Sequence, residues 1–94
     1  MSEHGALDDL SEETADNLVR RLRRIEGQIR GLQLMLTSDR SCKDVITQLT
    51  AARKALQQTG FLLVADRLHQ CATYPGAEAG DSMADIEQLF TELR

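Results

Sequence analysis

The stretch that decides the fold runs from Ser41 to Cys71 and reads SCKDVITQLTAARKALQQTGFLLVADRLHQC. It has no proline, a single glycine, and a cysteine at or near each end. Small or apolar side chains recur within it at alternating spacings of four and three, which predicts one amphipathic helix. The residues of this pattern are Val45, Leu49, Ala52, Leu56, Thr59 and Leu63.

The two cysteines of the chain, Cys42 and Cys71, stand at opposite ends of this predicted helix. At a rise of 1.5 Å per residue, a straight helix holds them roughly 44 Å apart, so they cannot meet within one chain. They can meet when two copies lie antiparallel, because the start of one helix then lies beside the end of the other. We therefore predict a dimer with two equivalent sites, each formed by Cys42 of one subunit and Cys71 of the other.

Another long helix is predicted before this stretch. Ser11 is a suitable N-cap, and the two glutamates after it favour the positive end of a helix dipole. Gly27 and Gly31 each cost about 1 kcal/mol relative to alanine, which predicts close packing of a second helix against them. The helix is expected to end near Ser38-Asp39. Its apolar seam, again at spacings of four and three, comprises Leu18, Leu22, Ile25, Ile29, Leu32 and Leu36.

The remaining segments complete an all-α, three-helix protomer. Residues 1–10 are small, acidic and aperiodic, so we expect a disordered acidic tail followed by one helical domain over residues 11–94. The segment ATYPG at 72–76 ends the central helix, and Asp81 or Ser82 can cap a short third helix. Long helices from 94 residues leave apolar faces uncovered, which predicts an oligomer. The buried stripe expected for the third helix is Met83, Ile86, Leu89, Phe90 and Leu93.

The net charge of −4 conceals an uneven distribution. Residues 1–17 carry six acids and no Lys or Arg, whereas residues 18–54 carry nine bases against three acids. Residues 55–94 return to two bases and six acids. A basic middle can bind a polyanion such as DNA despite the overall sign, and a solvated helix surface accounts for the charges equally well.

The sequence shows no signal peptide and no apolar run long enough for a membrane span, which predicts a cytoplasmic protein with reduced thiols. If Met1 is removed, the new amine and His4 can form a square-planar Cu(II) or Ni(II) site, although a tail histidine is the simpler interpretation.

Several motifs together resemble the CsoR/RcnR family of bacterial repressors. They are RLRRIEGQIRG at residues 21–31, CKDV at residues 42–45, Gln48, Leu68 and Cys71, and the resemblance covers about residues 18–72. It implies an antiparallel four-helix-bundle dimer core and a tetramer built as a dimer of dimers. It also implies operator DNA binding that is released when an inducer modifies the cysteine site.

The resemblance maps the family's sensing cysteines onto Cys42 and Cys71. In the copper sensors of the family, a histidine four residues before the second cysteine completes the Cu(I) site. That position is Arg67 here, and a guanidinium has no lone pair to donate to a metal. His69 lies roughly 200° around the helix from Cys71, so we interpret it as a surface or interface residue.

Arg67 instead favours thiol chemistry. A cation one turn before Cys71 stabilises its thiolate, and the start of the helix does the same for Cys42. This pair without the histidine is similar to the CstR branch of the family, whose members sense persulfides. The interpretation is a repressor released by intersubunit di- or polysulfide formation, with no cofactor. The alternative is a Cu(I) sensor that binds the metal through Cys42 and Cys71. The bland interpretation is that these residues have no sensing role: the cysteines are simply buried, and Arg67 reaches solvent.

Further residues receive roles from the resemblance. Ser41 and Glu87 fall roughly where the family couples the site to the third helix, and Glu87 can either contact Arg67 or lie on the surface. A thiol enzyme and a helical interaction module are rivals from other classes, but the absence of a CxxC motif and the basic first helix argue against an enzyme. The candidate DNA-binding residues are Arg21 and Arg24, supported by Arg20, Lys43, Arg53 and Lys54.

Overall fold

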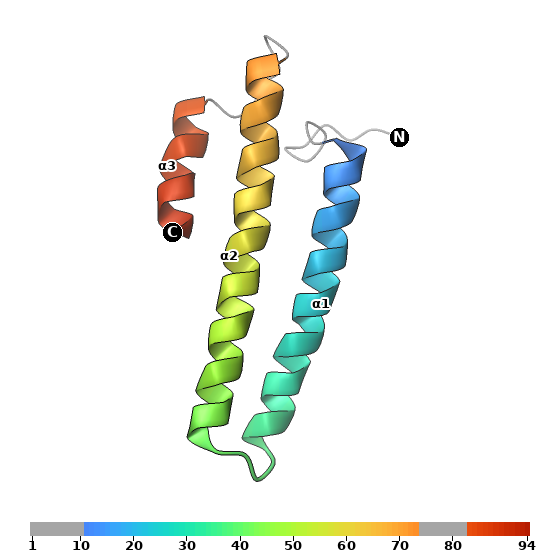
Figure 1. The fold of residues 1–94 in the computed structure, drawn as a ribbon, viewed down its shortest axis with the longest axis vertical. Coiled ribbons are helices and arrows are strands. Elements are labelled where there is room, and N and C mark those ends of the chain that lie inside the picture. Colours follow the sequence, from blue (N-terminus) through green and yellow to red (C-terminus); the bar gives the residue numbers. More distant parts are fainter. Residues whose placement is uncertain (1–10, 74–82) are drawn as a thin grey trace.

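A computed structural model describes residues 11–73 and 83–94, and within these ranges it contains three α-helices and no strand. They are α1 (Glu12–Leu36), α2 (Cys42–Thr73) and α3 (Met83–Leu93), and α2 lies between the other two (Figure 1). The predicted all-α, three-helix protomer is therefore confirmed. The expected tail at 1–10, with His4, and the expected cap at Asp81 or Ser82 lie outside the described residues.

The start of α1 follows the predicted capping pattern. The Ser11 side chain accepts a hydrogen bond from the Thr14 backbone N–H at 3.1 Å, which satisfies one of the donors that a helix start leaves open. The helix ends at Leu36, two residues before the predicted end. The Ser38 hydroxyl donates to the Leu34 carbonyl at 2.8 Å, and such side-chain bonds to the backbone compete with helix continuation.

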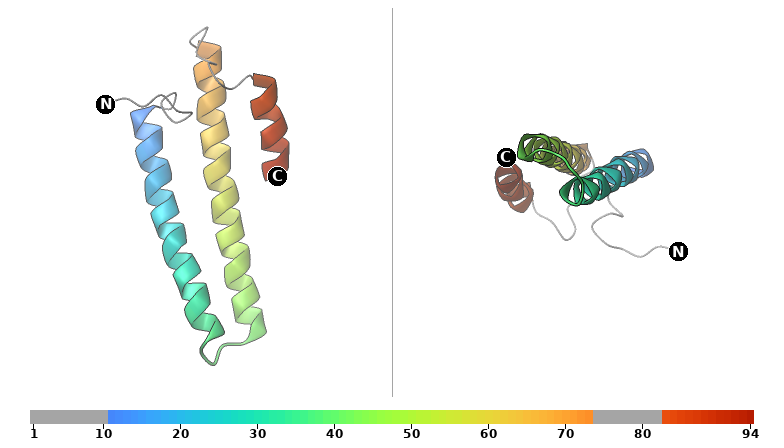
Figure 2. Two further views of the ribbon diagram at one scale, coloured as in Figure 1. Left: turned by 180° about the vertical axis from the view of Figure 1, so that it is seen from behind. Right: turned by 90° about the horizontal axis from the view of Figure 1, so that it is seen from below.

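Helix α2 has its own cap and ends where the sequence indicates. The Asp44 backbone N–H donates to the Ser41 hydroxyl at 3.1 Å, so Ser41 caps α2. The helix then runs 32 residues without interruption and stops at Thr73, within the predicted ATYPG segment. It is long and straight in Figure 2, so the two cysteine positions stay at opposite ends of one rod.

The interface between α1 and α2 buries every second residue of each predicted seam. In α1, Leu18, Ile25 and Leu32 are buried, and in α2 Ala52 and Thr59 are buried. The Thr59 hydroxyl donates to the Ala55 carbonyl at 2.8 Å, which satisfies its polar group within the interface. The alternate residues of both seams stay exposed, so one protomer covers only half of each apolar pattern.

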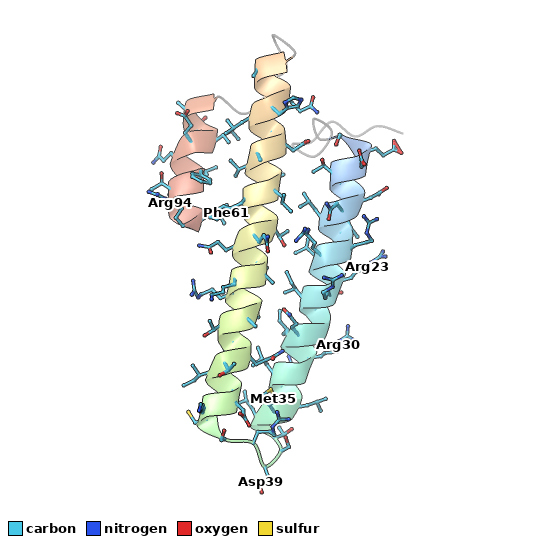
Figure 3. The ribbon with its side chains drawn as sticks, viewed as in Figure 1. Arg23, Arg30, Met35, Asp39, Phe61 and Arg94 are labelled. Atoms are coloured by element: carbon cyan, nitrogen blue, oxygen red, sulfur yellow. The ribbon has the colours of Figure 1, made fainter. Side chains whose placement is uncertain are left out.

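Helix α3 packs on the C-terminal half of α2. The Phe61 and Phe90 rings lie 5.1 Å apart between the two helices, and Phe61 is labelled in Figure 3. A Cβ added to Gly60 would lie 2.7 Å from Leu93 Cδ1, so this glycine permits the close approach of the two helices. The expected stripe of α3 is correct for Ile86, which is buried, and wrong for Leu89. The Leu89 side chain is 53% exposed because it lies on the side of α3 that faces away from α2.

The molecule is long and thin, with extents of 54 × 31 × 16 Å. Its radius of gyration is 16.7 Å, whereas a compact domain of this length has about 12 Å. Among the three described helices, seen from below in Figure 2, large apolar side chains such as Leu36, Ile46 and Leu49 remain exposed. Of the described helices, none combines the length and apolar character needed to cross a membrane.

Candidate functional site

Cys42 is the first residue of α2 and an exposed free cysteine. It lies in the first turn of α2, whose backbone N–H groups have no carbonyl partner further back in the same helix. The Ser41 hydroxyl beside it bonds to Asp44 within α2. Within one protomer Ser41 cannot reach α3, which contacts α2 from Gln57 onward, roughly 24 Å along the helix. The expected coupling of Ser41 to α3 therefore requires another subunit and stays a prediction.

Position 71 lies two residues before the end of α2. At 100° per residue, positions 42 and 71 differ by roughly 20° around the helix axis. The two cysteine positions therefore share one side of α2 while lying at its two ends. This placement meets the geometric requirement for a site between two antiparallel copies.

An exposed leucine stripe connects the two cysteine positions. We define it as Leu49, Leu56 and Leu63, which follow Cys42 at intervals of seven residues. Their side chains are 51%, 46% and 37% exposed. Helix α1 carries a parallel set, with Leu22 at 44% and Ile29 at 43% exposed. Apolar residues repeating every seven positions are the seam pattern of packed helices, so this side of the protomer is suited to a partner helix.

Arg67 lies one helical turn before Cys71 and is only 3% exposed. The bland interpretation, in which Arg67 merely reaches solvent, is wrong for this structure. A guanidinium is costly to bury unless charged or polar groups surround it, so its burial beside the cysteine position indicates a role in the interior. His69 is exposed, as the helix period predicts for a residue on the other side of α2.

Glu87 lies on the exposed surface of α3 at the edge of a cavity of about 170 Å³ between α2 and α3. The predicted contact between Glu87 and Arg67 stays a prediction. The other residues lining this cavity are apolar: Phe61, Val64, Ala65, Leu68 and Phe90.

Four arginines of α1 form a basic face on the side opposite its buried apolar residues. We define it as Arg20, Arg23, Arg24 and Arg30, which are all exposed and fall within roughly 120° of the helix circumference. Gly27 and Gly31 lie in the same sector, and a Cβ added to either would meet no atom within 4 Å. The close packing expected at these glycines is therefore not made within the protomer. The face is open to a partner.

Arg21, one of the two strongest candidates from the sequence, stands apart from this face. It is half-buried, and its Nε donates to Asn17 Oδ1 at 3.0 Å. Arg23 and Arg30, which Figure 3 labels, were not among the candidate DNA-binding residues, although their spacing relative to Arg20 and Arg24 carries the signal. On α2, the supporting candidates Lys43, Arg53 and Lys54 are all exposed.

A polar link between α1 and α2 was missed by the sequence reasoning. Asp66 Oδ2 accepts from the Ser11 backbone N–H at 3.3 Å, and Oδ1 accepts from the Thr14 hydroxyl at 3.0 Å. The pattern of apolar residues gave no signal for it, because Asp66 reads as one more polar residue of an amphipathic helix. The three residues lie at the same end of the protomer as Arg67.

Within the described residues of one protomer, no three His, Cys, Asp or Glu side chains gather closely enough to hold a metal ion. The donor set that two chains would offer at the cysteine positions is two thiolates, with a cation where the resemblance places an imidazole. Two thiolates suit a soft ion such as Cu(I), but they are one ligand short of the set implied by the resemblance.

Comparison with known proteins gives a consistent picture. The family described as "Metal-sensitive transcriptional repressor" matches residues 14–94. The copper-sensing transcriptional repressor CsoR of Bacillus subtilis (strain 168) is 33% identical over 97% of this chain and 95% of its own length. The copper-sensing transcriptional repressor RicR of Mycobacterium tuberculosis is 43% identical over 69% of this chain and 68% of its own. No solved structure matches.

Proposed function

Because the chain belongs to the family of metal-sensitive transcriptional repressors, we propose that it represses an operator through its basic α1 face and releases the DNA when an inducer links Cys42 and Cys71 of two antiparallel subunits. The family represses transcription, so the chain is not an enzyme. The predicted closer likeness to the persulfide-sensing branch is not supported by the relatives named above, which are copper sensors.

The observation that carries the proposal is the exposed leucine stripe with a cysteine position at each end. When two copies of α2 pack antiparallel through this stripe, Cys42 of each approaches Cys71 of the other. Covering a half-exposed leucine contributes about 1 kcal/mol, and the stripe supplies six such leucines per dimer. Leu22, Ile29 and Leu36 of α1 extend the same apolar surface, which supports a four-helix core. In this dimer the basic α1 faces stay exposed, so two dimers joined as a tetramer can bind one operator through them.

Operator binding is proposed to depend mainly on phosphate contacts. Exposed arginines on one helix face neutralise phosphates, and such binding weakens steeply as salt is raised. Open glycines in the middle of the face allow close approach of the DNA backbone. Arg24 and Arg20 are favoured over Arg21, because Arg21 is already held by Asn17.

Two inducers have specific support. The names of the relatives support Cu(I) more directly than any other inducer, and two thiolates can hold that ion. Burial of Arg67 at the position of the expected imidazole supports persulfide, because a cation there opposes an incoming metal ion and stabilises an attacking thiolate. We favour persulfide, since Arg67 belongs to this chain itself, and keep Cu(I) as the second candidate.

The persulfide reaction is balanced with a low-molecular-weight persulfide, RSSH, as oxidant. The Cys42 thiolate attacks the sulfane sulfur, a new S–S bond forms, and RS⁻ leaves. The Cys71 thiolate of the other subunit then attacks Cys42 Sγ and releases HS⁻, which leaves an intersubunit disulfide. A second RSSH converts Cys71 to its own persulfide with loss of RS⁻. Its outer sulfur then attacks Cys42 Sγ of the other subunit, the S–S bond of the Cys42 persulfide breaks, HS⁻ leaves, and a trisulfide joins the two cysteines.

The test measures binding of the reduced protein to DNA upstream of its own gene, before and after treatment with persulfide or with stoichiometric Cu(I). Persulfide is expected to release the DNA and to give a dimer band on a non-reducing gel, whereas Cu(I) leaves most DNA bound. Arg67→His restores an imidazole and is expected to increase the Cu(I) response, with Arg67→Lys as the control that keeps the charge. Release by Cu(I) with no response to persulfide would establish the copper sensor instead.

A further inference from the structure

The start of α1 is fastened to α2 by a carboxylate from the sensing end of the molecule. The Ser11 hydroxyl donates to Thr14 Oγ1 at 2.8 Å, and the Thr14 hydroxyl donates onward to Asp66 Oδ1 at 3.0 Å. The Ser11 backbone N–H donates to the second carboxylate oxygen at 3.3 Å. We refer to Ser11, Thr14 and Asp66 as the clasp.

The clasp does more than cap α1. The Ser11 hydroxyl already accepts from the Thr14 backbone N–H at 3.1 Å, so the first turn has its cap without any help from α2. Asp66 adds two bonds that run between helices, and hydrogen bonds to a carboxylate are stronger and more directional than neutral ones. A carboxylate beside a helix start is further favoured by the helix dipole.

The buried seam residues of α1 make contacts of a different kind. Leu18, Ile25 and Leu32 bury apolar surface against small residues such as Ala52. Apolar contacts are non-directional, so such an interface tolerates small sliding of one helix along the other. The clasp is directional and fixes the first turn of α1 to one particular residue of α2.

The position of the clasp connects the two parts of the proposed mechanism. Asp66 immediately precedes the buried Arg67 and lies five residues, roughly 7.5 Å of helix, before Cys71. Thr14 lies in the first turn of α1, which carries Arg20 and Arg24 within the next three turns. Two hydrogen bonds therefore link the end of α2 that carries position 71 to the first turn of the helix that carries the basic α1 face.

We propose that Asp66 is a positioning residue for regulation: through the clasp it makes α1 follow the C-terminal end of α2, so that modification of the cysteine site moves the DNA-binding helix. This inference rests on the proposed function, with either Cu(I) or persulfide as inducer. Without the clasp, α1 can hold its place on the DNA while the end of α2 shifts.

The test measures the release ratio, which is the operator dissociation constant after inducer treatment divided by that of the reduced protein. Thr14→Val removes the hydroxyl and keeps the shape, Thr14→Ser keeps the hydroxyl, and Thr50→Val is the matched control. The Thr50 hydroxyl bonds only within α2, to the Ile46 carbonyl at 3.0 Å, in the structure. Treatment uses whichever of persulfide or Cu(I) releases the wild type.

Thr14→Val is expected to lower the release ratio about fivefold or more, as loss of a hydrogen bond to a charged group in the coupling pathway should. Thr14→Ser and Thr50→Val should keep the wild-type ratio, while circular dichroism confirms that all variants fold. If Thr14→Val folds poorly, the nearly isosteric Asp66→Asn tests the same bonds, since an amide has one acceptor oxygen whereas the Asp66 carboxylate accepts both bonds.

An unchanged release ratio in both Thr14→Val and Asp66→Asn overturns the inference, even if their DNA affinity falls, because a merely structural role would weaken the reduced and treated states alike. Equal losses in Thr14→Ser and Thr14→Val also overturn it. A wild type that binds the operator but responds to neither inducer overturns the proposed sensing and the clasp with it, and this result is distinguishable because it appears before any variant is made.

Discussion

The two ends of α2 carry one cysteine position each, yet they are surrounded very differently. At the Cys42 end, every residue from 36 to 44 is exposed, and only the turn from α1 lies nearby. At the Cys71 end, Asp66 is bonded to α1, Arg67 is buried and α3 packs over Phe61 and its neighbours. We call the Cys42 end the bare end, because its thiol is exposed. We call the Cys71 end the constructed end, because residues near position 71 contact both α1 and α3.

The difference explains why a site made of both ends can both react and respond. An antiparallel dimer places the bare end of one subunit against the constructed end of the other. In the proposed mechanism the exposed Cys42 would meet the inducer first, and the helix end near Cys71 is bonded through Asp66 to α1, the helix proposed to bind DNA. A site built from two bare ends could react with the inducer, but it would have no contact through which a movement could reach the basic α1 face.

The largest effect is expected from separating the two cysteines onto different subunits. Cys42→Ser alone and Cys71→Ser alone should give no cross-linked dimer with persulfide, because like ends lie far apart in an antiparallel pair. Mixed and reassembled, the two variants should recover a cross-link at one of the two sites, visible on a non-reducing gel. A strong cross-link in Cys71→Ser alone would mean that the Cys42 ends meet, and the comparison of the two ends would fail.

A charge in the middle of the exposed leucine stripe should separate the subunits. Leu56→Glu places two carboxylates in the proposed interface, and the cost of burying them predicts a dimer at least about a hundredfold weaker. Leu56 is 46% exposed, so the protomer itself should fold normally. Light scattering and circular dichroism measure the two properties.

The control for that variant is Leu89→Glu, since Leu89 is similarly exposed but lies on α3, away from the stripe. It should remain a tetramer and bind operator DNA. If Leu56→Glu assembles as the wild type does, or if the wild type is already a monomer at micromolar concentration, the antiparallel arrangement is wrong.

Most of the fold followed from local sequence signals, and the sites between elements did not. Ser11 indicated the start of the first helix, and the stretch between the two cysteines indicated the second. The spacing of apolar residues showed which of them share one side of each helix. The periods could not tell which half of each seam one protomer buries, because Leu18 and Leu22 look alike until α2 is placed. Leu89 was assigned to the core for the same reason.

The candidate site shows the same division. The sequence alone identified Cys42, Cys71 and the arginine in place of the histidine. The family resemblance marks these positions, and the helix period relates residues within one helix. The bonds of Asp66 to Ser11 and Thr14 join residues more than 50 positions apart in the sequence, and the burial of Arg67 arises only in the packed structure. No spacing rule along the chain contains that information.

Among the basic residues, Arg24→Ala should weaken operator binding more than Arg21→Ala. Arg24 lies in the exposed α1 face, whereas Arg21 is half-buried and bonded to Asn17. Arg24→Ala is expected to cost about fivefold to tenfold in affinity and to reduce the salt dependence by about one phosphate contact per subunit. Fluorescence anisotropy over a salt series measures both. Arg94→Ala at the end of α3 is the control, and a larger loss for Arg21→Ala would move the DNA surface toward α2.

The smallest effects should come from two glycines in the middle of helices. Gly27→Ala gains helix propensity in open space, so it should raise the free energy of unfolding by about 1 kcal/mol unless another subunit or DNA packs there. Gly60→Ala has the same gain, but its new methyl group meets Leu93 Cδ1 and Cδ2 at 2.7 and 2.8 Å. Leu93 must move its terminal methyl groups, which offsets part of this gain. Urea unfolding at one protein concentration should therefore give a higher free energy of unfolding for Gly27→Ala than for Gly60→Ala. The reverse order would show that the open glycines of α1, and not the contact between α2 and α3, lie in the tighter interface.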